Sequence, residues 1–231
     1  MKKTYLVCII ALVWGCIPAL VQAQSANSPQ AFYDKYLIAC VDSGRNFDET
    51  TFVKTYGVLD ATRKNVPSQD QPFFDQFLFA WIGSGKDFDV NPFVKTFGVL
   101  LATRKNVSGQ DQAFYDQYIT RWAGTNKSFD ENILVKNFGV LLATRKNVSG
   151  QDQTFFDQLL FSWISSPKNL DVNPFVKTFG VLLATRKNVS GQEQAFFDQY
   201  IIHWAGTNRG FDENAVVKTF GVLLATRKNV K

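Results

Sequence analysis

Apolar residues recur along this chain at the spacing of an α-helix. In one segment, five of them stand at offsets 0, 1, 4, 5 and 8: Phe114, Tyr115, Tyr118, Ile119 and Trp122. At about 100° per residue, these positions cover a stripe about 140° wide, which is the width of a helix face packed on a core. A half-buried β-strand would instead alternate apolar and polar residues. The pattern therefore predicts a helix, with Ser108 and Asp111 as its capping box and Gly124 as its stop.

A second stripe predicts a second helix, formed by Phe93, Val94, Phe97, Leu100 and Leu101. Asn91 and Pro92 stand where an N-cap and a first-turn proline are favoured. Arg104 and Lys105 stand in the last turn, where cations suit the helix dipole. The sequence thus predicts pairs of helices.

Glycines interrupt the second stripe at positions 57, 98, 139, 180 and 221. A glycine inside a helix costs about 1 kcal/mol relative to alanine, so its recurrence predicts close approach of a neighbouring helix or ring. The alternative ends each helix at the glycine and makes the following Val-Leu-Leu-Ala-Thr-Arg a strand, which would give an α/β solenoid. Because the stripe continues through the glycine at helical spacing, we favour helices throughout.

The two-helix pattern repeats five times at intervals of 41 residues. Ala-Thr-Arg-Lys-Asn-Val begins at 61, 102, 143, 184 and 225. Neither helix can bury its stripe alone, so stacked neighbours must complete the core. The expected fold is all-α, an α-solenoid of five tandem helical hairpins within residues 31–231. The repeats span residues 31–71, 72–112, 113–153, 154–194 and 195–231.

The first 23 residues resemble a secretory signal peptide. Lys2 and Lys3 precede an apolar run, and Val21-Gln22-Ala23 has the small-residue pattern of a cleavage site. A short linker, residues 24–30, would follow, and the protein would be secreted or periplasmic. The alternatives are a membrane anchor that is not cleaved and a lipid anchor at Cys16.

Composition argues against several classes of function. The net charge of +5 falls to +3 when Lys2 and Lys3 leave with the leader, which is too mild to indicate nucleic-acid binding. His203 is the only histidine, and the mature chain would keep Cys40 alone among the cysteines. This inventory predicts no catalytic constellation, no metal site and no cofactor. We expect Cys40 to pack in the core and His203 to be a partly exposed helix residue.

Each second helix ends with an Arg-Lys pair, and these basic pairs are the candidate binding residues. Stacked repeats would align them along one edge roughly 10 Å apart, as a ladder for an acidic glycan. The alternative is that acidic residues of the following unit, Asp70, Asp111, Asp152 and Glu193, neutralise them. The central members of the ladder are Arg104, Lys105, Arg145, Lys146, Arg186 and Lys187.

Other recurring polar residues have structural interpretations. An aspartate precedes each second helix, at 48, 89, 130, 171 and 212, and predicts an N-cap rather than a calcium ligand. Asn106, Asn126, Asn147 and Asn188 begin glycosylation sequons. At three of these, a helix stop followed by a serine cap is the alternative to glycosylation.

The two ends of the array differ from its middle. Asp60 replaces a leucine of the second stripe, which predicts that the first repeat is a cap, with a buried and paired Asp60 as the alternative. Repeat five keeps the full apolar set, including Phe220, Leu223 and Leu224, and no polar helix follows it. Because solenoids need polar outer faces, this end is a candidate homodimer interface.

The sequence therefore indicates an exported, non-catalytic binding or structural repeat protein. An anionic polymer or a protein partner is the expected ligand, and nucleic acid is not. A carrier of lipid or another apolar ligand is the alternative, prompted by the 15% of aromatic residues. An enzyme is a weaker interpretation.

Overall fold

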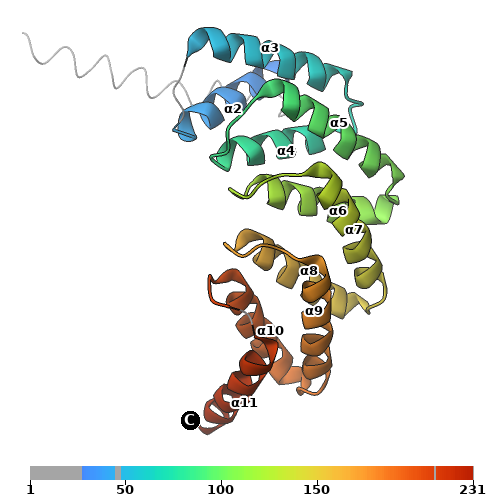
Figure 1. Cartoon of the computed structure of the whole chain (residues 1–231), viewed down its shortest axis with the longest axis vertical. Coiled ribbons are helices and arrows are strands. Elements are labelled where there is room, and N and C mark those ends of the chain that lie inside the picture. The colour runs from blue at the N-terminus through green and yellow to red at the C-terminus, as the bar shows by residue number, and fades with distance from the viewer. Residues whose placement is uncertain (1–27, 45–47, 211, 231) are drawn as a thin grey trace, which may run out of the picture. The chain divides into compact units, whose positions relative to one another are not determined.

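The computed structural model describes residues 28–44, 48–210 and 212–230. Within these ranges the chain forms α-helices and no β-strand (Figure 1). The all-α prediction is confirmed, and the α/β alternative is wrong because each second helix continues through its glycine. The leader at residues 1–23, Cys16 and most of the linker at 24–30 lie outside the described residues.

Each repeat contributes two helices. The first helices are α2 (Pro29–Asp42), α4 (Gln71–Gly83), α6 (Gly109–Ala123), α8 (Gly150–Ser165) and α10 (Gly191–Gly206). The second helices are α3 (Glu49–Asn65), α5 (Val90–Asn106), α7 (Glu131–Lys146), α9 (Val172–Lys187) and α11 (Glu213–Asn229).

Aspartate side chains cap every second helix. Asp89 accepts from the backbone N–H of Asn91 at 3.0 Å, and Asp130 caps α7 in the same way. Asp48, Asp171 and Asp212 complete the row of N-caps, as predicted. The assignment of Asn91 as N-cap is wrong, since α5 begins at Val90 and Asn91 lies within its first turn.

The first helices are capped differently. Ser108 is the N-cap of α6, but its hydroxyl donates to the carboxylate of Asp111 and makes no bond to a backbone N–H. Asp111 is buried and pairs with a lysine, so the predicted capping box is replaced by an ion pair. Gly124 ends α6, as predicted.

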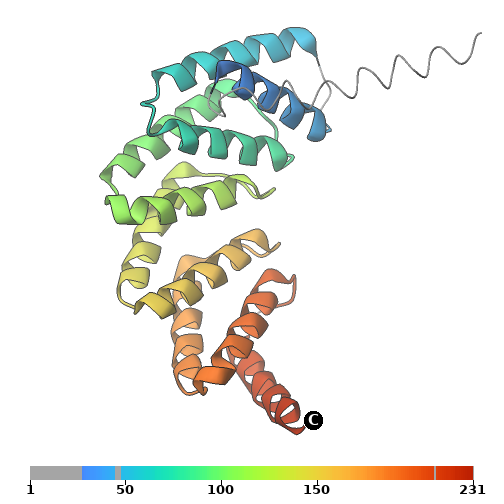
Figure 2. The ribbon, with the colours of Figure 1, turned by 180° about the vertical axis from the view of Figure 1, so that it is seen from behind.

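The chain divides into two compact units, residues 1–67 and 68–231. In the second unit, first helices contact first helices in the order α4, α6, α8 and α10. Second helices contact second helices in the order α5, α7, α9 and α11 (Figure 2). Consecutive repeats of this unit therefore meet in the same way each time, first helix against first helix and second helix against second helix.

Aromatic rings fill the core of each repeat in the second unit. Phe74 of α4 meets Phe97 of α5 edge to face, with ring centroids 4.9 Å apart. Tyr115 and Phe138 repeat this contact at 4.8 Å between α6 and α7. Burial of each such ring contributes about 1.5–3 kcal/mol, and the edge-to-face geometry adds roughly 0.5–1.5 kcal/mol. The aromatic content of the sequence is largely accounted for by this core.

The described residues of the first unit form one pair of helices, α2 and α3. Tyr36 of α2 stacks on Phe52 of α3 with centroids 5.0 Å apart. Asp60 is half-buried and pairs with Lys64 one turn later, within α3. The corresponding Leu101 is also half-buried, whereas Leu100 beside it is fully buried. The Asp60 position is therefore at the margin of the stripe, which explains why a charge is tolerated there.

The prediction that the mid-helix glycines permit close approach is wrong. A Cβ atom built at Gly57, Gly98, Gly139, Gly180 or Gly221 meets no atom within 4 Å. These positions face outward, away from the neighbouring helices. Nothing in the structure explains why all five repeats keep a glycine there.

We therefore expect Gly139→Ala to raise the free energy of unfolding by about 1 kcal/mol, because alanine restores helix propensity without a clash. Gly206→Ala is the control, since its Cβ would lie 2.9 Å from Oγ of Ser162. That hydroxyl already donates to the carbonyl of Ile202 and could move only by giving up this bond. Urea denaturation measures both variants. A destabilised Gly139→Ala protein would contradict the open environment.

Candidate functional site

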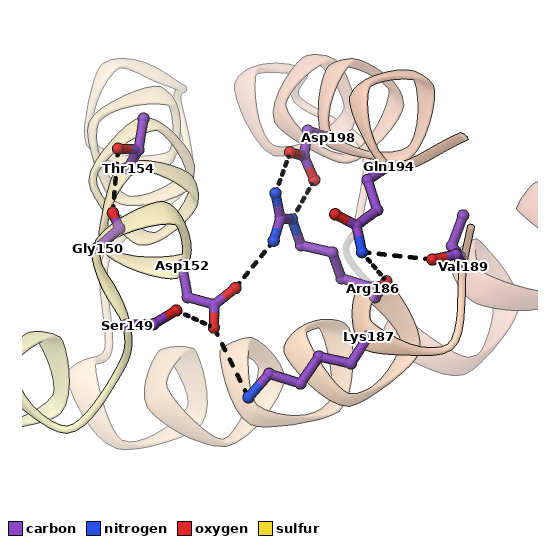
Figure 3. Close-up of polar contacts among 9 residues, drawn as sticks. All are labelled: Ser149, Gly150, Asp152, Thr154, Arg186, Lys187, Val189, Gln194 and Asp198. Atoms are coloured by element: carbon purple, nitrogen blue, oxygen red, sulfur yellow. Dashed lines mark hydrogen bonds and ion pairs between the residues drawn. The ribbon is translucent and has the colours of Figure 1, made fainter. Parts of the chain in front are cut away.

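The arginines of the three central basic pairs, Arg104, Arg145 and Arg186, bind carboxylates of the chain itself. Arg186 lies between two carboxylates from different repeats (Figure 3). Its Nη1 contacts Oδ1 of Asp152 at 2.8 Å, and its Nε and Nη2 donate to Asp198 at 2.8 and 3.0 Å. The Arg186 side chain is 10% exposed. Hydrogen bonding to Asp198 raises the pKa of Arg186, so it remains a cation bound by its own chain.

Arg104 makes the same contacts one pair of repeats earlier. It donates to Asp70 at 2.6 Å and forms a two-bond contact with Asp116 at 2.7 and 2.8 Å. Its guanidinium also lies over the ring of Phe73, with the ring centroid 5.4 Å away. A planar guanidinium suits this geometry because it can bond two carboxylates while stacking on an aromatic ring.

The third arginine shows a variation. Arg145 forms the two-bond contact with Asp157 at 2.8 and 2.9 Å. Lys146, in place of the arginine, forms the ion pair with Asp111 of the preceding helix, at 2.7 Å. Lys187 lies 3.6 Å from Asp152, while Lys105 is exposed and makes no ion pair with any residue in the described ranges. The chain's own carboxylates thus hold five of the six predicted binding residues.

A second row of cations was missed by sequence analysis. Lys86 Nζ donates to the carbonyls of Trp122 and Ala123 at the end of α6, at 3.3 and 2.9 Å. Lys127 and Lys168 reach the next repeat in the same way. Each ammonium also lies over a tryptophan of its own repeat. The missed signal was the 41-residue spacing of Lys86, Lys127, Lys168 and Arg209.

These lysines satisfy carbonyls that a helix end leaves without partners. Burial lowers the pKa of Lys86 to about 8, and it lowers the pKa values of Lys127 and Lys168 as well. Arginine–carboxylate pairs therefore join consecutive repeats at the middle of the first helices, at Asp116, Asp157 and Asp198. Lysine–carbonyl contacts join them near the end.

Two open cavities lie along the first helices of the second unit. One, of about 810 Å³, is lined by residues of α4 and α6 and by the turns after α6 and α8, including Gln76, Gln117 and Asn126. The other, of about 770 Å³, is lined by α6, α8 and α10, including Gln158 and Gln199. Arg121 and Ser165 line both. We call this surface the glutamine groove.

Two of the recurring glutamine positions in these repeats have different roles. Gln112 Nε2 donates to the carbonyls of Arg104 and Val107, and Gln194 does the same one pair of repeats later. These amides hold the connection between repeats. The groove glutamines at 76, 117, 158 and 199 are exposed, and their amides make no hydrogen bond to another described residue. The fold uses the first row and leaves the second for other contacts.

The groove lining contains no carboxylate. Its polar groups are amides, hydroxyls and the side chains of Arg121, Lys127 and His203. Arg121 is exposed and forms no ion pair with the part of the chain that the structure describes. His203 is exposed, as predicted, whereas Cys40 is half-buried and not a fully packed core residue. The groove can thus donate hydrogen bonds to a polar or anionic chain.

The described residues contain no group of three His, Cys, Asp or Glu side chains placed to hold a metal ion. No helix among them is long and apolar enough to cross a membrane. Comparison of the chain with protein-family models, curated proteins and solved structures gives no match.

Removal of a buried arginine tests its structural role. We expect Arg186→Met to lower the free energy of unfolding by about 3 kcal/mol, because it strands the carboxylates of Asp152 and Asp198. Lys105→Met should change it by less than about 0.5 kcal/mol, as is usual at exposed sites. Chemical denaturation measures both. Equally small changes in the free energy of unfolding for the two variants would contradict the structural role of Arg186.

A second prediction concerns acid. Lys146 and Ser108 lower the pKa of the Asp111 carboxyl below its ordinary value of 3.8. The charged form stabilises the fold above that value, and this contribution is lost as pH falls through the lowered pKa. We expect Asp111→Asn to cost up to about 1 kcal/mol at pH 6, because solvent screens the half-exposed Lys146. Near pH 3 the difference in the free energy of unfolding between the wild type and this variant should shrink. An unchanged difference in urea unfolding at both pH values would contradict it.

Proposed function

We propose that this protein is an exported, non-catalytic binding module whose glutamine groove holds an extended, acidic glycan. The observation that carries the proposal is the composition of the groove. It combines a cation without an internal partner, exposed amides and several hydroxyls, with no carboxylate on its lining. Sugar hydroxyls both donate and accept hydrogen bonds, and amides and hydroxyls can answer both roles.

The repeat supports a polymeric ligand. We infer an α-solenoid of five helical hairpins, in which each added repeat extends the binding surface by one step. The groove glutamines recur once per repeat, and packed helices lie 8–10 Å apart. A chain of sugars could meet an equivalent amide at each step, so weak contacts would sum along its length.

The groove replaces the ladder of Arg-Lys pairs as our preferred site. A guanidinium already bonded to two carboxylates would have to give them up before it could bind a ligand. Arg121 has no such cost. The lipid-carrier alternative stays a prediction, and a polar lining does not favour an apolar ligand. The unexceptional placement of His203 offers no support for catalysis.

Export is part of the same proposal. It rests on the basic start, apolar run and small-residue site of the first 23 residues. An extracellular or periplasmic location would bring the groove into contact with cell-surface or environmental polysaccharide.

Calorimetric titration with a uronic-acid oligosaccharide tests the groove. We expect saturable binding that Arg121→Gln weakens about tenfold, which corresponds to about 1.4 kcal/mol. Lys105→Gln is the matched control, because it removes one exposed positive charge from the alternative ladder. It should leave the affinity nearly unchanged.

A carboxyl-reduced, neutral form of the oligosaccharide separates the contribution of the groove amides from the contribution of the Arg121 charge. Gln117→Ala should weaken binding of both forms, whereas Arg121→Gln should affect mainly the acidic one. If Lys105→Gln lowered the affinity more than Arg121→Gln did, the binding site would lie at the basic pairs and not in the glutamine groove. Absence of binding to both forms would overturn the proposed ligand.

A further inference from the structure

Consecutive repeats in residues 68–231 meet through one set of contacts, made three times. An arginine of one repeat binds the aspartate of the next, in the pairs Arg104–Asp116, Arg145–Asp157 and Arg186–Asp198. An aromatic ring of the first helix meets a ring of the next first helix, as Phe155 meets Phe197 at 6.1 Å. A lysine then donates to the last carbonyls of that helix.

Repeat five presents the same groups, and no described residue contacts them as a following repeat would. Arg227 lies over the ring of Phe196, 4.8 Å from its centroid, as Arg186 lies over Phe155. It is exposed and has no carboxylate partner within the described residues. Arg209 lies over Trp204 in the place of the lysines, and no carbonyl of the described chain accepts from its guanidinium.

The apolar part of this end is also uncovered. Leu223 occupies the position of Leu100, Leu141 and Leu182, which are all 0% exposed. Leu223 itself is 40% exposed. It, rather than Leu224, is therefore the residue that a following repeat would bury. Burial of a leucine contributes about 1.5–3 kcal/mol, so this end favours a partner.

The matching surface stands at the other end of the chain, on α2. Asp34 occupies the position of Asp116, Asp157 and Asp198, and Gln30 donates to it at 3.0 Å. Val41 stands at the position of Ala123, Ile164 and Ala205. Those three side chains are 0% exposed, whereas Val41 is 62% exposed. Tyr33 is only half-buried, although its counterpart Phe197 is fully buried.

We propose that repeat five of one chain docks on α2 of a second copy, head to tail, and reproduces the contact between repeats. Arg227 binds Asp34 of the second copy, and Phe196 meets its Tyr33. Arg209 donates to the carbonyls of Cys40 and Val41 at the end of α2, which correspond to those that Lys168 uses in α10. Leu223 is covered by the same helix.

The charges favour this pairing over a two-fold contact between two C-terminal ends. A two-fold contact would place Arg227 and Arg209 of one copy against the same cations of the other, and like charges at an interface oppose binding. The head-to-tail contact joins a cation to a carboxylate. Because its two surfaces differ, it can continue into open chains or close into rings. It does not depend on the ligand of the groove.

A charge swap tests the proposal by sedimentation velocity. The wild-type chain should associate with increasing concentration, and Arg227→Asp and Asp34→Arg should each be monomeric. A mixture of the two variants should recover association, because Asp at 227 meets Arg at 34 and the remaining ends are wild type. Lys218→Asp is the matched control, since it changes an exposed α11 lysine whose counterpart Lys177 is also exposed, and it should associate like wild type.

Three results would overturn the proposal. They are a wild-type chain that stays monomeric up to its solubility limit, loss of association in Arg227→Asp but not in Asp34→Arg, and no recovery on mixing. The second would indicate a contact between C-terminal ends. Val41→Asp provides an independent variant, because a side chain that is 62% exposed can be changed without loss of the fold. It should also be monomeric, with an unchanged helical circular dichroism spectrum.

Discussion

The guanidinium of Arg186 lies between a carboxylate of α8 and a carboxylate of α10. Three nearly buried ionic groups meet there, and none is stable without the others, because an unpaired charge in this setting is costly. Rings such as Phe155 and Phe197 add apolar burial to the same contact, but apolar burial is not directional and admits many orientations. The two-bond contact of Arg186 with Asp198 admits far fewer. The contact between Arg186 and Asp198 therefore fixes the orientation of α10 relative to the preceding repeat. Lys168 fixes the carboxyl end of α10 through its last carbonyls.

This arrangement changes the meaning of the positive charge in the sequence. Most of the recurring cations bind groups of the chain itself, either carboxylates of the first helices or carbonyls at the ends of those helices. The central arginines of the ladder cannot bind a polymer without loosening the contacts between repeats. A surface that the fold does not use, such as the row of Gln117 and Gln158 with Arg121, can bind a ligand at no such cost. The proposed site follows from this division between residues that join repeats and residues that do not.

The same contact also gives the two ends of the chain their properties. A repeat protein made of nearly identical units carries the complementary halves of its internal contact at its two ends, unless substitutions remove them. Here Arg227 and Leu223 remain at one end, and Asp34 and Tyr33 remain at the other. Asp60 was interpreted as the mark of a capping repeat. It lies at the margin of the stripe and pairs with Lys64, so it leaves the outer face of α2 unchanged.

The sequence by itself determined the features that depend on near neighbours. The spacing of Phe114 and Trp122 gave the helix and its buried face, and Asp89 or Asp130 gave the helix starts, because a cap bonds a residue two or three positions away. Tertiary structure decided the rest. The period of 41 indicates that Arg186 recurs, but not whether its partner is a ligand or Asp152, which lies 34 residues earlier and is brought close only by packing. Gly139 shows the same limit. Its cost to the helix is local and predictable, whereas the space around it depends on where neighbouring helices lie.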